Sequence, residues 1–132
     1  MMRRADWPER LAEFIAARRD TPFAWGAHDC ALFAFDAVAA MTGVDLIPAH
    51  RGAWHDARSA AAHEAAIGGL PAAVSALLPQ IPPAFSGRGD VVLLRHDGRD
   101  SLGIHLGDRC AFTGHDGLLF LPPSAILAAW SA

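Results

Sequence analysis

The pattern of apolar residues changes from helical to alternating near Gly89, and this change constrains the fold more than any other feature of the chain. Before it, apolar side chains recur at the three- and four-residue spacing of helices. After it, short apolar or alternating runs separated by Gly and Asp predict strands near residues 91–94, 101–106, 110–113 and 118–121. Helices followed by consecutive strands predict an α+β fold, with N-terminal helices packed on one face of a C-terminal antiparallel β-meander.

The helical half divides into four predicted helices, at residues 6–19, 30–41, 55–67 and 71–78. Gly43 suits the left-handed residue that commonly ends a helix such as the second one. After the strands, Pro122-Pro123 predicts the start of a last short helix that ends near Trp130.

The size and composition fit one folded domain spanning residues 1–132, with 52% hydrophobic and 19% charged residues. A formal net charge of -3 does not favour nucleic-acid binding. No apolar stretch approaches the length of a membrane span, and Asp6, Pro8 and Glu9 stand where a signal peptide needs an apolar run. We therefore expect the chain to be made as a soluble cytoplasmic protein.

The two cysteines, Cys30 and Cys110, allow a single pair, so we expect no disulfide framework in so apolar a chain. There is no C-x-x-C motif, and the seven histidines lack the spacing of metal ligands. We expect neither a metal site nor a cofactor.

Cys30 follows a polar loop and begins the second predicted helix. Unpaired backbone N–H groups at a helix start favour the thiolate, which is the nucleophilic form of cysteine. Asp29 is placed to cap this helix, and Trp25-Gly26 supplies an aromatic wall and a flexible backbone beside the thiol. Cys30 is thus the candidate nucleophile, whereas Cys110 lies within a strand pattern and is expected in the core.

Three segments resemble the NlpC/P60 family of cysteine peptidases. Phe23-Ala24-Trp25-Gly26 with Asp29-Cys30 is similar to the motif around the family's nucleophile. Ser86 to Val92 is similar to the Gly-Asp entry into the family's first core strand. Ser101 to Gly107 is similar to the strand that in the family begins with the catalytic His. A helical insert at residues 45–85 lies outside the resemblance. Gly103-Ile104 with Gly107, together with Ala111-Phe112, Gly117-Leu118 and a closing Ala-Trp, is similar to small members encoded in phage and gene-transfer-agent tail modules.

The resemblance implies a papain-like fold with a Cys nucleophile, a His base and a third polar residue that orients the His. Such enzymes hydrolyse peptide bonds in bacterial cell-wall stems, and the tail-module members lie at the tail tip beside hub proteins. Here Ser101 occupies the position of the base, and a serine cannot act as a general base at neutral pH. His105 is four residues further along the strand, roughly 13 Å away, which is too far to replace it.

Two other histidines are candidate bases. If the turn before the strand contains the four residues Asp97 to Asp100, His96 lies directly opposite Ser101; if it contains two, His96 pairs with Arg99. His28, two residues before the cysteine, is the other candidate, since it could reach the thiol from the loop.

These observations leave two hypotheses. In the first, the chain is a degenerate NlpC/P60-like module that binds phage-type tail hub or tail-tip proteins, is made in the bacterial cytoplasm and ends in the virion or tail particle. In the second, Cys30 attacks a peptidoglycan stem peptide, His96 or His28 accepts the proton, and backbone N–H groups at the helix start stabilise the oxyanion.

Overall fold

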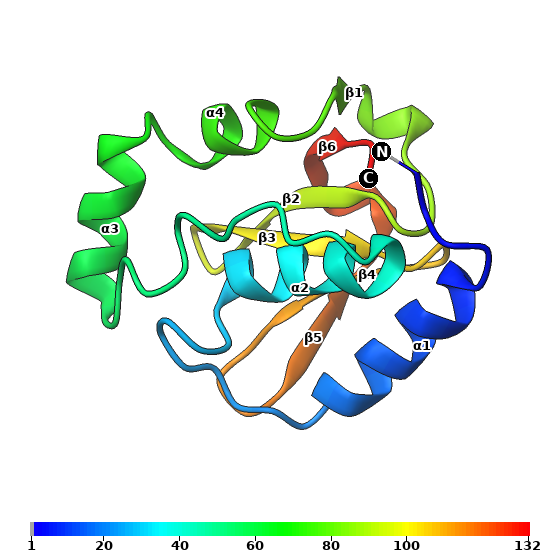
Figure 1. Cartoon of the computed structure of the whole chain (residues 1–132), viewed down its shortest axis with the longest axis horizontal. Helices are drawn as coiled ribbons and strands as arrows, with labels where there is room; N and C mark the ends of the chain where they lie inside the picture. Colours follow the sequence, from blue (N-terminus) through cyan, green and yellow to red (C-terminus); the bar gives the residue numbers. More distant parts are fainter. Residues whose placement is uncertain (1) are drawn as a thin grey trace.

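The helical half and the strand half form two layers in the computed structural model, which describes residues 2–132 (Figure 1). The four α-helices are α1 (Trp7–Arg18), α2 (Cys30–Thr42), α3 (Ala57–Ala66) and α4 (Leu70–Ser75). All four begin within two residues of their predicted starts, although α4 is shorter than expected. The predicted α+β class is confirmed.

The helices differ in how they are held. Helix α2 ends as predicted, with Gly43 at φ 79 and its N–H donating to the Ala39 carbonyl. Helix α3 contributes no buried residue and stands at one end of the molecule (Figure 1). Within residues 2–132, no helix combines the length and the apolar character needed to cross a membrane.

One antiparallel sheet contains six strands in the order β1-β6-β2-β3-β4-β5. Their bounds are β1 Gln80–Ile81, β2 Val91–His96, β3 Arg99–His105, β4 Cys110–Thr113, β5 Leu118–Leu121 and β6 Ile126–Trp130. Strands β2 to β5 are the predicted meander. The sequence analysis missed β1 and β6, which extend the sheet beyond the other edge of β2.

The predicted last helix is wrong. After Pro122 the chain makes a single 3₁₀ turn, Pro123–Ala125, and then forms β6. Strand β6 pairs with the second edge of β2, for example Val92 with Ala129. Since unpaired backbone groups of a buried strand are costly, this long-range pairing overrides the local helix-start signal of the two prolines.

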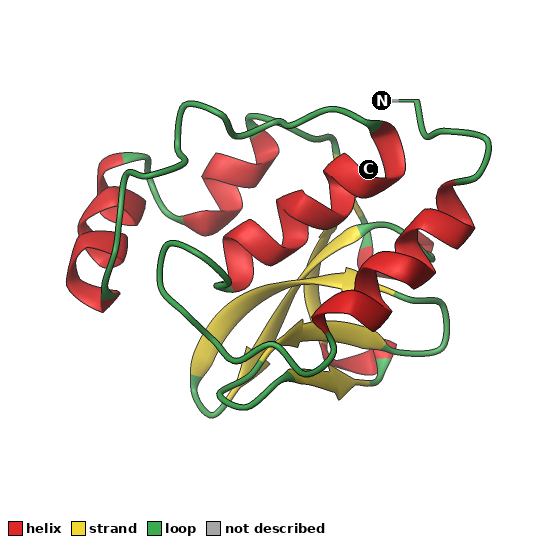
Figure 2. Ribbon diagram, turned by 60° about the horizontal axis from the view of Figure 1, so that its bottom comes forward, coloured by secondary structure: helices red, strands yellow, loops and turns green. Residues whose placement is uncertain are grey.

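The core lies mainly between α2 and the sheet, with the helices gathered on one side of the strands (Figure 2). The sheet contributes to it Val91, Leu93, Leu102 and Ile104. A smaller cluster of alternate residues comprises Val92, Leu94, Cys110, Phe112 and Ala129. Cys110 is therefore a core residue, as predicted, and burial raises the pKa of its thiol to about 11.

The turn between β2 and β3 contains two residues, Asp97 and Gly98, with φ of 50 and 74. Positive φ at both central residues is the mark of the type I′ turn that best joins two twisted strands. His96 consequently pairs with Arg99, and Leu94 is the residue opposite Ser101. The longer turn, which would have placed His96 opposite Ser101, is excluded.

Candidate functional site

Asp29 organises the loop that leads into α2. One carboxylate oxygen accepts the Leu32 N–H at 3.1 Å and so caps the helix, as predicted. The other accepts the Gly26 N–H at 2.9 Å and the Trp54 indole N–H at 2.6 Å. The carboxylate is buried and accepts hydrogen bonds from three donors, so it holds the loop in position.

Gly26 permits the close approach between this loop and the segment before α3. Its φ is 76, and a Cβ at this position would lie 2.6 Å from the Trp54 carbonyl oxygen. Only glycine fits this combination of left-handed backbone and contact. Gly26 of the sequence motif therefore lies against a segment that the motif itself does not include.

The Cys30 thiol lies at the start of α2, against β3. Strand β4 pairs with β3 at Ile104 and His105, so this pairing does not include Ser101 or Leu102. The Leu102 backbone and the Ser101 hydroxyl act on the thiol as hydrogen-bonding groups that favour its ionised form. Ser101 thus stands beside Cys30, in the place that the family resemblance assigns to the base.

The environment of Cys30 opposes ionisation. Burial is the largest effect and raises the pKa of the thiol above its usual 9.0, and the negative charges of Asp29 and Glu64 raise it further. The two hydrogen-bonding groups from β3 act in the opposite direction but do not outweigh burial. The helix start alone predicts an easily ionised thiol, whereas desolvation of the partly buried Cys30 and the nearby negative charges act in the opposite direction.

His96 lies at the hairpin end of β2 with its ring 5.3 Å from the Phe112 ring, which belongs to the smaller core cluster. Its Nε2 is 3.3 Å from the Asp97 carboxylate. Helix α2 packs with the main cluster instead. The register and these contacts place His96 with the smaller cluster and not beside the start of α2.

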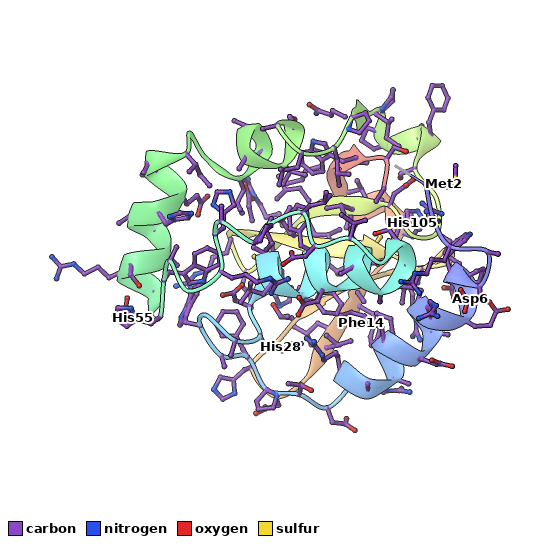
Figure 3. All side chains as sticks on the ribbon, viewed as in Figure 1. Met2, Asp6, Phe14, His28, His55 and His105 are labelled. Atoms are coloured by element: carbon purple, nitrogen blue, oxygen red, sulfur yellow. The ribbon has the colours of Figure 1, made fainter. Side chains whose placement is uncertain are left out.

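His28 turns toward α1. Its Nδ1 accepts a hydrogen bond from the Arg18 guanidinium at 3.2 Å, and its ring lies 5.9 Å from the Phe33 ring. Figure 3 shows His28 on the same side of α2 as Phe14 of α1. Burial, followed by the charge of Arg18, lowers the pKa of His28, so the ring is neutral at pH 7 with its proton on Nε2. Through Nδ1 this side chain joins the loop before α2 to α1.

Cys30 opens onto a groove with a volume of about 310 Å³ that the sequence analysis did not anticipate. The insert at residues 45–85 builds its walls, and the lining is mainly apolar. Ala57, Ala60, Ala61 and Glu64 of α3 lie along one wall. These positions have the i, i+3, i+4, i+7 spacing of one helix face, which is the signal in the sequence that could have located the groove.

Two histidines of the insert line the same groove. His50 Nδ1 and His63 Nε2 are 2.9 Å apart, and the Trp54 ring lies 5.3 Å from that of His63. The indole N–H of Trp54 in turn donates a hydrogen bond to the Asp29 carboxylate. The groove therefore connects the loop before Cys30 to a hydrogen-bonded histidine pair that none of the recognised motifs includes.

The described residues contain no group of three or more His, Cys, Asp or Glu side chains placed to hold a metal ion. A comparison with protein families finds one that matches residues 2–132 and is described as a domain of unknown function (DUF6950). No curated protein matches the chain.

Proposed function

Because the chain belongs to the DUF6950 family, whose description assigns no activity, we propose a function from the site itself: a non-catalytic NlpC/P60-like module that serves as a structural or adaptor component at the tip of a phage-type tail. One observation carries the non-catalytic part. The Cys30 thiol lies near Ser101, whose hydroxyl donates to the Leu102 carbonyl at 3.2 Å, and the pKa of the thiol is raised by burial. A thiol without a base and with a raised pKa is a poor nucleophile at neutral pH.

The layout of the site supports the NlpC/P60-like assignment. The cysteine begins the helix that packs on the sheet, and Ser101, which begins the third motif, comes from β3. The Gly-Asp motif leads into β2, as the resemblance implies: Gly89 donates to the His105 carbonyl at 2.8 Å, and His105 donates to that of Asp90 at 2.9 Å. The tail-tip assignment depends on the resemblance of the strand motifs, and its partners would be tail hub or tail-tip proteins.

In this function the groove beside Cys30 binds a segment of a partner protein and does not cleave it. Its lining is predominantly apolar, and Asp29, its most buried carboxylate, is already engaged by three donors. Concave apolar sites with few polar groups are typical binding sites. An apolar segment of a hub protein is the occupant that fits an adaptor.

The second candidate function is a cysteine peptidase that cleaves peptidoglycan stem peptides. The observation that favours it is the His50–His63 pair in the groove onto which Cys30 opens. In that reaction the thiol proton passes to an imidazole, the sulfur forms a bond to the peptide carbonyl carbon, and the amine leaves with the proton. The contacts of His96 with Asp97 and Phe112, and of His28 with Arg18, give no comparable support to this alternative.

Thiol reactivity separates the two functions. The variant Cys110→Ala leaves Cys30 as the single cysteine, and its alkylation by iodoacetamide is measured at pH 7. The non-catalytic module predicts slow alkylation that is unchanged by His63→Ala. Fast alkylation that falls at least tenfold in His63→Ala would establish a cysteine–histidine pair and refute the non-catalytic proposal.

Tail association is tested separately. An epitope-tagged chain is expressed in the producing bacterium, tail particles are purified, and the tag is located by immunogold labelling. We expect labelling confined to the tail tip. Absence of the tag from both particles and tail-assembly intermediates would refute the tail proposal, whatever the reactivity of Cys30.

A further inference from the structure

A second cavity, also of about 310 Å³, lies between α1 and the β3–β4 turn, away from the groove of Cys30. Its lining is largely apolar and includes Ile15 and Ala16 of α1 and Phe120 of β5. Its rim carries three arginines, Arg19, Arg88 and Arg109. We call this site the arginine hollow.

The three rim arginines keep their charge available. Among the described residues, none of them forms an ion pair, whereas Arg3, Arg18 and Arg51 are all paired with aspartates. They come from three separate parts of the chain: the residue after α1, the loop before β2 and the turn between β3 and β4. Their common place in the lining of this cavity gives it a positive charge, which an anion would complement.

Two of the rim arginines are held in place by contacts that leave their charge unpaired. The Arg109 guanidinium lies 4.2 Å from the centroid of the Phe120 ring. Arg88 donates to the Pro8 carbonyl at 3.4 Å and lies 6.0 Å from the Trp7 ring. Stacking and carbonyl contacts orient a guanidinium without neutralising it.

We propose that the arginine hollow binds an acidic, apolar peptide segment of a partner protein. Guanidinium groups bind carboxylates through two parallel hydrogen bonds, and the apolar lining accepts a Leu or Phe side chain next to them. Asp108 is the one acidic residue of the lining, so the local charge is positive although the net charge of the chain is -3. That net charge disfavours long polyanions such as nucleic acid, and a short acidic segment is the better match.

The test is calorimetric titration of the full chain with the acetylated, amidated peptide Glu-Leu-Glu-Phe-Glu. Arg88→Gln and Arg109→Gln should each weaken binding about tenfold, the loss expected for one charge-assisted pair. The matched control is Arg58→Gln, which makes the same charge change at an exposed position of α3 and should leave binding unchanged. Thermal melts verify that the three variants are folded, and amide shifts in residues 106–109 locate the site.

Other probes distinguish the competing ligands. The peptide Gln-Leu-Gln-Phe-Gln, which has the same apolar side chains, should bind at least tenfold more weakly than the acidic one. Equal binding of the two peptides, no binding of the acidic peptide, or an equal loss in Arg58→Gln would overturn the proposal. So would binding of inorganic phosphate or phosphatidylglycerol vesicles that is as strong as that of the acidic peptide.

Discussion

Replacing Asp29 by alanine tests the claim that this carboxylate organises the site. The change removes the acceptor of three hydrogen bonds, from Leu32, Gly26 and Trp54. Loss of a helix cap costs about 1 kcal/mol. Each of the other two donors, deprived of its partner, adds about 1 to 1.5 kcal/mol, so the free energy of unfolding should fall by about 3 to 4 kcal/mol.

Urea unfolding followed by tryptophan fluorescence measures this loss. Domains of this size are typically stable by about 5–15 kcal/mol, so Asp29→Ala should still fold. Loss of the hydrogen bond at 2.6 Å should also shift the Trp54 contribution to the emission of the folded protein.

The matched control is Asp56→Ala, which removes the exposed cap of α3. Asp56 also caps a helix through an N–H at its third position, but the residue is exposed. We expect a much smaller loss of stability and unchanged emission. If Asp29→Ala costs no more than Asp56→Ala, Asp29 is an ordinary cap and does not organise the loop.

Three further predictions concern the surroundings of this loop. Because Ser101 is the side chain beside the thiol, Ser101→His should speed alkylation of Cys30 at pH 7 at least tenfold, measured in a variant lacking the other cysteine; an unchanged rate would place position 101 out of reach. Gly26→Ala should lower the free energy of unfolding by about 1–3 kcal/mol, measured by urea titration, because of its positive φ and the Trp54 carbonyl. The pKa of His28 is lowered on folding, so below pH 6.5 the unfolded chain binds a proton that the folded chain does not. The free energy of unfolding should therefore fall as the pH drops below 6.5, and it should fall less in His28→Gln. Urea midpoints of both proteins at pH 7 and pH 5 measure this difference.

Local signals predicted the parts of the fold that local interactions determine. Gly43 ends α2 because its N–H closes the last turn in a left-handed conformation. Asp29 caps the same helix through an N–H three residues away. Such contacts join residues close in sequence, so residue type and spacing were sufficient to find them.

Features that depend on distant residues were missed or mistaken. Strand β6 forms because β2 has a second edge to pair, and the prolines before it carry no information about that edge. The raised pKa of Cys30 comes from burial by segments far along the chain, which outweighs the helix start. His96 was a candidate base until the two-residue turn fixed its register.

The candidate site divides in the same way. The sequence was sufficient to predict the cysteine at the helix start, its cap, and Ser101 as a residue of the site. It did not locate the groove, because the insert becomes a wall only when Trp54 reaches Asp29 and Gly26. The histidine pair of that wall, His50 and His63, follows no spacing rule since its members are brought together from a loop and a helix.

Helix α3 contains no buried residue, so the side chains that line the groove there are different from those that stabilise the core. The thiol belongs to α2, whose side chains form much of the core, so substitutions in this helix should lower the stability of the whole domain. The facing wall is carried by a helix whose side chains add little to the free energy of folding. Changes at Ala60 or Ala61 can therefore reshape the groove at almost no thermodynamic cost, which makes α3 the part of the molecule where binding preference is freest to diverge.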